Sequence, residues 1–310
     1  MSAPFISVLV PVYNREGLLP ACLESACAQT VRDLEVIVVD NASTDATWDI
    51  CRRFAERDPR IRIFRNETNI GPVRNWRRCF REARGLYGKV LFSDDLISPT
   101  FLERTIPYLD DSETGFVFTM AEIGADPERA KPSYRWRDRP GKFASAEFLH
   151  DAMYAGDVPV SPGAALFRLA DLRDSLVEFI PSNLPGDFAA HGAGPDLLLY
   201  LLTAARYLAV AHIPEPLTFF RWHPGSISYM ENARLQDCYT QARIWFASNF
   251  DRGSLLSEAI SAAWFSRMKS QRRWIWPDEI RRKFLDAPVC DSAHFFSSLA
   301  FLLRRKLTSL

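Results

Sequence analysis

Apolar residues follow two different periods along the first hundred residues of the chain. Short runs rich in β-branched residues predict buried strands at residues 6–13, 34–39, 61–64 and 89–92. Between these runs, apolar residues recur at helical spacing and predict helices at residues 17–30, 46–57 and 73–84. Because strand and helix alternate with short connections, we expect an α/β fold with a mostly parallel, Rossmann-like sheet flanked by helices.

The alternation becomes less regular after residue 100. Helices are predicted at 101–109, 145–154 and 195–207, strands at 115–120, 164–167, 208–213 and 217–220, and a charged loop at 126–141. From about residue 228 the pattern is wholly helical, with helices predicted at 232–249, 255–273, 277–285 and 292–306. We therefore expect a domain at residues 1–228, with halves at 1–100 and 101–228, and a C-terminal helical region at 229–310.

Polar side chains gather where the first four predicted strands end. These positions are Tyr13-Asn14, Asp40-Asn41, Asn66 and Ser93-Asp94-Asp95. In open parallel sheets, ligands bind in the crevice outside the carboxyl ends of the strands. The pattern therefore predicts one binding site that these strand ends share.

Composition and charge narrow the classes of protein. Lys plus Arg and Asp plus Glu both number 38, so a formal net charge of zero gives no reason to expect nucleic acid as a partner. The six cysteines include no CxxC pair, which argues against a disulfide framework and against a zinc site. The first apolar run has no basic segment before it and is read as a strand, so we expect no signal peptide. No stretch approaches the roughly 18 apolar residues of a membrane span. We expect a cytoplasmic protein.

The adjacent carboxylates Asp94 and Asp95 have two interpretations. They repel each other unless a cation lies beside them, and Mg²⁺ or Mn²⁺ shared with substrate phosphates supplies one. The alternative is a solvated acidic turn before the next helix. Their position at the end of a fourth parallel strand favours the metal.

Seven segments resemble, in order, the motifs of family 2 glycosyltransferases of the GT-A fold. Four lie in the first half of the predicted domain: SVLVPVYNRE (7–16), VIVVDNASTDAT (36–47), NETNIGPVRNW (66–76) and KVLFSDDLISPTFL (89–102). Three follow later: VSPGAALFR (160–168), PDLLLYL (195–201) and PEPLTFFRWHPGSIS (214–228). Each motif is weak alone, but the ordered series covers residues 5 to about 228.

The resemblance implies a nucleotide site in the first half of the chain. Pro11, Val12, Tyr13 and Asn14 match the segment beside the nucleobase. Asp40 matches the residue that hydrogen-bonds the base, although it can also form an Asx turn or cap the next helix. The segment from Asn69 to Arg74 matches the one that closes over the base, with Arg74 as its polar contact.

The same resemblance assigns the acidic pair. Ser93-Asp94-Asp95 occupies the place of the DxD-type motif, with Phe92 where the first aspartate commonly stands. Ser93 and Asp94 are then expected near the ribose or phosphate, and Asp95 on Mn²⁺ or Mg²⁺.

The second half of the resemblance implies a catalytic base. Asp196 matches the carboxylate that deprotonates the acceptor hydroxyl in inverting members, and Asp187 is an alternative base. As a helix N-cap, Asp196 has a structural interpretation as well. His223 matches a position that contacts the metal or diphosphate, and it also has a purely structural interpretation. Arg221 is expected to neutralise the leaving diphosphate.

These assignments predict an inverting glycosyltransferase that moves a sugar from a UDP- or dTDP-sugar to a hydroxyl of a carbohydrate or lipid-linked glycan. Two alternatives are a catalytically inactive sugar-nucleotide-binding module and a sugar-phosphate nucleotidyltransferase. The nucleotidyltransferase and a dehydrogenase both need a glycine-rich loop after the first strand, and residues 11–15 contain no glycine.

The last predicted helix has an amphipathic, basic end. Six large apolar side chains between residues 293 and 303, all Phe or Leu, precede Arg304, Arg305 and Lys306. This helix either docks on the domain or rests on the inner face of an anionic membrane. The sequence leaves both interpretations, and the oligomeric state, open.

Overall fold

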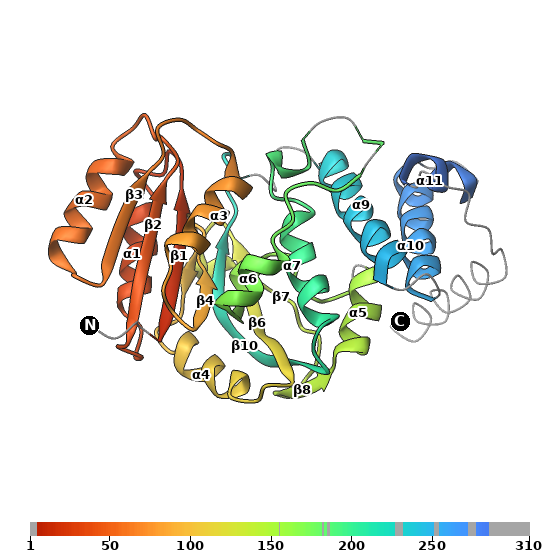
Figure 1. Ribbon diagram of the computed structural model, residues 1–310, viewed down its shortest axis with the longest axis horizontal. Coiled ribbons are helices and arrows are strands. Elements are labelled where there is room, and N and C mark those ends of the chain that lie inside the picture. Colours follow the sequence, from red (N-terminus) through yellow and green to blue (C-terminus); the bar gives the residue numbers. More distant parts are fainter. Residues whose placement is uncertain are drawn as a thin grey trace.

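The computed structural model describes residues 5–154, 156–181, 183–184, 187–226, 232–250, 254–271 and 277–284. These residues form one mixed sheet of ten strands with helices on both faces (Figure 1). The main strand order is β3-β2-β1-β4-β9-β6-β10-β5, with β7 beside β6 and β8 beside β10. The strands are β1 (Ile6–Val12), β2 (Leu34–Asp40), β3 (Ile61–Arg65), β4 (Tyr87–Val90), β5 (Leu96–Ile97), β6 (Thr114–Gly124), β7 (Lys131–Ser133), β8 (Gly141–Ala144), β9 (Ala165–Arg168) and β10 (Ala209–Arg221).

The predicted α/β fold is confirmed. Strands β1 to β4 pair in parallel, as the alternation of strand and helix requires. Strand β9 then runs antiparallel between β4 and β6, and β10 runs parallel to β6. The helices of this part are α1 (Leu19–Cys27), α2 (Thr47–Arg57), α3 (Pro72–Glu82), α4 (Phe101–Leu109), α5 (Ser145–Met153), α6 (Leu169–Ser175) and α7 (Pro195–Ala204).

Some details of the second half differ from the prediction. The strands predicted at 208–213 and 217–220 are one strand, β10, whose pairing with β6 shifts register around Pro216. The irregular pairing explains why the sequence pattern is interrupted there. The charged loop at 126–141 contains the short strand β7, and α6 lies where no element was predicted.

Side chains alternate between two hydrophobic cores, one on each face of the sheet. On β1, Leu9 belongs to the core that also contains residues of α3, α5, α6 and α7. Its neighbours Val8 and Val10 belong to the core under α1, α2 and α4. Because both faces are covered, the strands are apolar throughout instead of alternating with polar residues.

An aromatic cluster positions α7 against the sheet. Phe116 of β6 contacts Phe148 of α5, Phe167 of β9 and Tyr200 of α7, with ring centroids between 5.0 and 5.3 Å apart. The Tyr200 hydroxyl also donates a hydrogen bond to the carbonyl of Ser161 at 2.7 Å. Buried aromatic contacts of this kind fix the orientation of a helix, so the first turn of α7 has a defined place.

The helical region shares the core of the main domain. Its described helices are α9 (Asn232–Phe250), α10 (Ser254–Gln271) and α11 (Pro277–Phe284). Buried residues of α9 and α10 join the same core as Leu197 and Leu201 of α7. The predicted boundary at residue 228 and the predicted basic helix at 292–306 lie outside the described residues. Within the described ranges, no helix has both the length and the apolar character needed to span a bilayer.

A buried carboxylate links four segments at the amino ends of the strands. Glu35 of β2 accepts hydrogen bonds from the Ser7 hydroxyl at 2.7 Å and the Arg84 backbone at 2.6 Å. Its other oxygen accepts from the Arg62 guanidinium at 2.8 Å. This end of the sheet is opposite to the predicted ligand site, so the role of Glu35 is purely structural.

We expect Glu35→Gln to lower the free energy of unfolding by about 2 kcal/mol, because it leaves Arg62 without its buried counter-charge. Chemical denaturation followed by circular dichroism measures this change. The matched control is Glu24→Gln on the exposed side of α1, which we expect to change stability by less than about 0.5 kcal/mol. Equal effects of the two substitutions would contradict the structural role of Glu35.

Candidate active site

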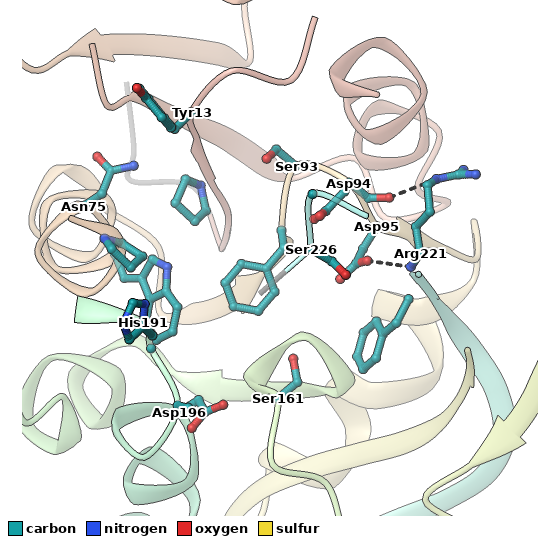
Figure 2. A pocket seen from close by; sticks show the side chains of 18 of the residues that line it. Tyr13, Asn75, Ser93, Asp94, Asp95, Ser161, His191, Asp196, Arg221 and Ser226 are labelled. Atoms are coloured by element: carbon teal, nitrogen blue, oxygen red, sulfur yellow. Dashed lines mark hydrogen bonds between the residues drawn. The ribbon is translucent and has the colours of Figure 1, made fainter. Parts of the chain in front are cut away.

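A cavity of about 630 Å³ lies at the carboxyl ends of the strands, where the sequence predicts it. Segments from both halves of the chain line it (Figure 2). The first half contributes residues 11–15, Asn41, Asn69, Asn75, Trp76 and 92–95, and the second half contributes Tyr134, Ser161, 190–193, Asp196 and 220–222. Leu235 and Tyr239 of α9 complete the wall.

The acidic pair lies in the turn between β4 and β5, beside the end of β10. Asp95 is buried, and its Oδ1 accepts a hydrogen bond from the backbone N–H of Arg221 at 2.9 Å. Burial raises the pKa of Asp95 well above its usual range, and the neighbouring charge of Asp94 raises it further. A cation at this point would stabilise the ionised carboxylate.

Asp94 has basic neighbours. Its Oδ2 lies 3.0 Å from Nε2 of His223 and 3.7 Å from Nε of Arg15. Nε of Arg221 donates to the Asp94 carbonyl at 3.3 Å, and Nη2 of Arg15 donates to the Gly225 carbonyl at 3.1 Å. The structure therefore brings Asp94, Asp95 and Arg221 together and adds Arg15. His223 contacts Asp94 and is not among the residues that line the cavity, so its contact with a metal stays a prediction.

A buried lysine lies behind this pair. Lys89 of β4 donates from Nζ to the carbonyl of Gly163, and Nζ lies 4.4 Å from the ring centroid of Phe101. Burial lowers the pKa of Lys89 to about 7, and the negative charge of Asp95 acts in the opposite direction. The charge of Lys89 therefore lowers the pKa of Asp95 in part. The sequence pattern showed Lys89 only as a residue of the fourth strand and did not point to this role.

The residues near the acidic pair fit a metal shared with a ligand better than a metal held by protein alone. Among the described residues, no three His, Cys, Asp or Glu side chains form a set that can hold a metal ion. Mg²⁺ and Mn²⁺ commonly use one or two carboxylates together with phosphates and water. The buried, electrostatically unfavourable carboxylate of Asp95 matches that pattern.

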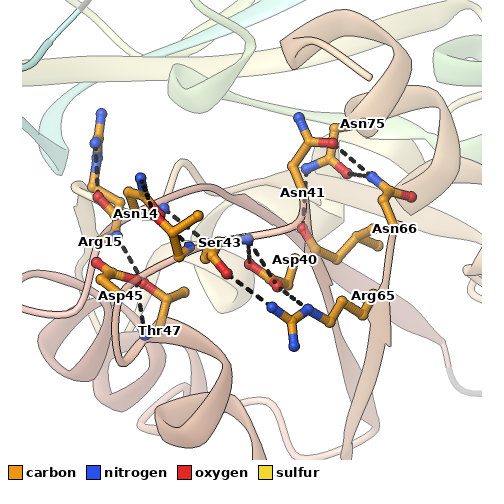
Figure 3. Close-up of polar contacts among 12 residues, drawn as sticks. Asn14, Arg15, Asp40, Asn41, Ser43, Asp45, Thr47, Arg65, Asn66 and Asn75 are labelled. Carbon is orange, nitrogen blue, oxygen red and sulfur yellow. Dashed lines mark hydrogen bonds and ion pairs between the residues drawn. The ribbon is translucent and has the colours of Figure 1, made fainter. Parts of the chain in front are cut away.

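Asp40 ends β2, and Figure 3 shows its contacts with Ser43 and Arg65. It is fully buried, both carboxylate oxygens accept from the Ser43 backbone N–H at 3.2 Å, and Oδ2 pairs with Nε of Arg65 at 3.1 Å. It is not among the residues that line the cavity. A local structural role is therefore observed, in which the Asp40 side chain accepts from the backbone three residues on instead of forming an Asx turn. A direct contact between Asp40 and a nucleobase stays a prediction.

Four asparagines organise the loops above Asp40. Asn41 donates to Oδ1 of Asn69 at 2.8 Å and accepts from Asn66 at 2.8 Å. Asn66 also donates to Asn75, which in turn donates to the Val39 carbonyl at 3.0 Å. Because Asn41, Asn69 and Asn75 all line the cavity, amide groups form its polar surface on this side.

Arg74 and Asp187 form an ion pair outside the cavity lining. Nη1 of Arg74 lies 3.0 Å from Oδ2 of Asp187, and both side chains are nearly half exposed. A hydrogen bond from the Ala189 backbone lowers the pKa of Asp187 below its usual value, aided by Arg74. The predicted base-closing arginine and the alternative catalytic base therefore contact each other.

Asp196 lies in the first turn of α7 and faces the cavity. Its Oδ1 accepts from the backbone N–H groups of Gly194 at 2.8 Å and Leu197 at 2.7 Å. Its Oδ2 accepts from the Tyr239 hydroxyl at 2.8 Å. Burial raises the pKa of Asp196 to about 7, although these hydrogen bonds act in the opposite direction. A carboxylate with such a pKa can exchange protons near neutral pH.

Aromatic side chains form much of the remaining wall. Trp76 and Phe92 lie 5.3 Å apart between ring centroids, and Gly192 fits against Trp76. Gly192 has φ +78°, and a Cβ there would lie 2.5 Å from the Trp76 ring, so a larger residue has no room. Trp76 ends one of the motifs, whereas Tyr134 and Tyr239 lie outside all seven motifs.

The strand order, the cavity at the strand ends and the acidic pair after β4 define a protein of the GT-A fold class. Solved structures of this kind align over most of the chain. S. aureus TarS 1–349 in complex with UDP-GlcNAc aligns with a TM-score of 0.63 and 16% identity over 97% of this chain and 81% of that chain. The mannosyltransferase PcManGT from Pyrobaculum calidifontis, in complex with GDP-Man and Mn²⁺, aligns with a TM-score of 0.57 and 18% identity over 100% and 84%.

Sequence comparison gives the family. The family model "Glycosyl transferase family 2" matches residues 7–173, more than half of the chain. The putative glycosyltransferase EpsH of Bacillus subtilis (strain 168) is 37% identical over 231 residues, which cover 73% of this chain and 63% of EpsH. The chain thus spans less than two thirds of the length of the first curated relatives that it matches. It belongs to glycosyl transferase family 2.

We expect Arg65→Gln to lower the free energy of unfolding by about 2 kcal/mol, because the buried Asp40 loses its counter-charge. The control is Arg52→Gln, which removes an exposed ion pair with Asp49 one turn away on α2. We expect the control to change stability by about 0.5 kcal/mol or less. Thermal and chemical unfolding measure both variants, and a neutral Arg65→Gln would show that Asp40 is stabilised in another way.

Proposed function

We propose that this protein is an inverting glycosyltransferase that moves a sugar from a nucleoside-diphosphate sugar to an acceptor hydroxyl. One observation carries the proposal. Two buried carboxylates, Asp95 and Asp196, face a single cavity from different walls (Figure 2). In-line displacement with inversion needs the leaving group and the base on opposite sides of the anomeric carbon. In the proposal the leaving diphosphate lies at the wall of Asp95 and the base is Asp196 on the other wall.

We place the nucleoside of the donor at the carboxyl ends of β1 and β2, and its diphosphate at the acidic pair. The proposed base site is bordered by Pro11, Val12, Tyr13, Asn14 and Asn69. Asp40 and Arg74 are the proposed polar contacts of the base. Ser93 and Asp94 are assigned to the ribose or phosphate. UDP- or dTDP-sugars are the proposed donors, and the TarS complex with UDP-GlcNAc supports this class.

Asp95 is the proposed protein ligand for Mn²⁺ or Mg²⁺, and His223, which contacts the neighbouring Asp94, is proposed as a second ligand. When bound, the metal supplies positive charge that binds the diphosphate and favours its departure. The Mn²⁺ and GDP-Man in the PcManGT complex support this assignment. Arg221 and Arg15 are positioned to bind phosphate oxygens and to neutralise charge on the leaving nucleotide.

Asp196 is the proposed base. Its Oδ2 takes the proton of the acceptor hydroxyl while that oxygen forms a bond to the anomeric carbon. The bond from the anomeric carbon to the diphosphate oxygen breaks, and the leaving nucleotide keeps the electron pair. A pKa near 7 suits this task, because about half of the carboxyl groups are ionised at neutral pH and the carboxylate is a stronger proton acceptor than one with an ordinary pKa.

The acceptor is a carbohydrate or a lipid-linked glycan in the proposed reaction. Tyr134, Phe220, Trp222 and Tyr239 line the cavity on the side of the second half. Aromatic faces combined with hydroxyl and carboxylate groups suit a sugar ring, which presents both C–H and O–H groups. We place this transfer in the assembly of a bacterial polysaccharide or glycan.

A melting screen with UDP, GDP and dTDP, each with and without Mn²⁺, tests the donor site. We expect one nucleotide to stabilise the protein, by about 2.7 kcal/mol at a hundredfold excess over Kd, and Mn²⁺ to increase the effect. Asp95→Asn should lose the increment due to Mn²⁺, whereas Asp110→Asn, an exposed substitution after α4, should keep it. A full increment in Asp95→Asn would contradict the metal assignment, and stabilisation without turnover of any nucleotide-sugar would indicate an inactive binding module.

The pH dependence of kcat/KM tests the base. Because Asp196 must be ionised to accept a proton and its pKa is raised to about 7, kcat/KM should rise about tenfold per pH unit below that value and level off above it. Asp196→Asn should lower kcat by about 10²- to 10⁴-fold on the plateau above that pH, and the variant should lack the acid limb. A comparable loss in Asp187→Asn, with Asp196→Asn active, would move the base to Asp187.

A further inference from the structure

We propose that Tyr239 of α9 is a positioning residue for the catalytic base Asp196. This inference rests on the proposed function of Asp196. It adds a residue from the C-terminal helical region, about forty positions beyond the base, to the machinery of transfer. Its basis is the geometry around one carboxylate at the boundary between α7 and α9.

The hydrogen bonds around Asp196 leave one direction for the acceptor. Two backbone N–H groups, from Gly194 and Leu197, hold Oδ1. The hydroxyl of Tyr239 occupies one lone pair of Oδ2 at 2.8 Å. The carboxylate therefore has a fixed rotation, and the second lone pair of Oδ2 is available to an acceptor hydroxyl. Tyr239 and Asp196 both line the cavity in which that hydroxyl would lie.

Tyr239 is the donor in this pair. Burial raises the pKa of its phenol well above the usual value, and the charge of Asp196 raises it further. The phenol therefore stays protonated over the pH range in which Asp196 titrates. A donor to the ionised carboxylate favours the charged form and keeps the pKa of Asp196 lower than burial alone would set it.

Close packing of α9 against the start of α7 brings the Tyr239 hydroxyl within hydrogen-bonding distance of Asp196. Gly194, directly before α7, has φ +99°, and a Cβ there would lie 3.2 Å from the carbonyl oxygen of Cys238 and 2.6 Å from the Phe188 ring. The backbone of α9 thus lies against the turn that begins α7, at the residue before Tyr239. Glycine permits both the backbone conformation and this approach.

Other titratable groups also face Asp196. Arg243, one turn after Tyr239 on α9, donates from Nε to the Ala152 carbonyl at 2.7 Å, and its charge lowers the pKa of Asp196. Tyr200 of α7 and Tyr134 are buried phenols whose pKa values are raised, so they are neutral where Asp196 titrates. Tyr239 is the side chain of this group that hydrogen-bonds the base in the described part of the chain.

The test compares Tyr239→Phe with the matched control Tyr207→Phe. Tyr207 makes the same type of bond, from its hydroxyl to Oδ2 of Asp171 at 2.9 Å, outside the cavity lining. In Tyr239→Phe, the acid limb of kcat/KM should move to higher pH by about one unit, and kcat should fall by about tenfold. In Tyr207→Phe the limb should stay in place. The substrate is whichever nucleotide-sugar the protein turns over in a panel that includes UDP-GlcNAc and GDP-mannose.

A substitution of opposite sign separates positioning from a loss of folding. Replacing Tyr239 by 3-fluorotyrosine keeps the hydrogen bond and makes the phenol a stronger donor, so the acid limb should move to lower pH. The pKa of Asp196 can also be measured without turnover, from the carboxyl ¹³C signal that is missing in Asp196→Asn. These measurements keep the test valid if Tyr239→Phe is too unstable to assay.

The outcomes distinguish this inference from the proposed function. If Asp196→Asn keeps full activity, the base assignment fails, whatever Tyr239 does. If Asp196→Asn is inactive but Tyr239→Phe and 3-fluorotyrosine leave both the acid limb and the ¹³C titration unchanged, the base stands and Tyr239 has no positioning role.

Discussion

The hydrogen bond from the Arg221 backbone to the buried Asp95 carboxylate joins the two halves of the site. It connects the end of the fourth strand with the end of the tenth, 126 positions later in the chain. Because the donor is a backbone group, its place is set by the pairing of β10 with β6 and not by a side-chain rotamer. The proposed diphosphate site therefore depends on the central sheet as a whole.

The two buried carboxylates of the cavity are stabilised in different ways. Asp95 lies beside another acid, and Lys89 and Arg221 offset only part of the unfavourable charge. Asp196 has no adjacent acid in its first helical turn, and three hydrogen bonds hold its oxygens. The first environment favours association with a cation, and the second favours a group that gains and loses a proton near neutrality. The difference in environment supports the division of roles between them.

The sequence predicted the first hundred residues closely because local rules act there. Each strand is a short β-branched run, each helix follows at once, and parallel pairing places Ser93, Asp94 and Asp95 at the same edge as Tyr13 and Asn41. Arg15 was within reach of the same reasoning, since it follows the first strand. No role was assigned to it from the sequence, because its contact with Gly225 spans 210 positions.

The second half was harder to predict because its features depend on tertiary contacts. The register shifts that join two predicted strands into β10 come from its pairing with β6. The partner of Asp40 is Arg65, and both lie at strand ends, but only the register of β2 and β3 sets them side by side. No periodicity marks Tyr239, because its place follows from the packing of α9 on the turn at Gly194.

The hydrogen bond from Arg15 to the carbonyl of Gly225 has a consequence for biosynthesis. Arg15 leaves the ribosome early, yet its partner is made only after more than two hundred further residues. The parallel strands β1 to β4 can pair while synthesis continues, since their contacts are close in sequence. The proposed phosphate end of the cavity, in contrast, can form only when β10 and the residues up to Gly225 have been added. A nascent chain that ends before β10 therefore has the parallel strands that carry the first half of the site, but lacks the wall formed by β10 and the residues up to Gly225.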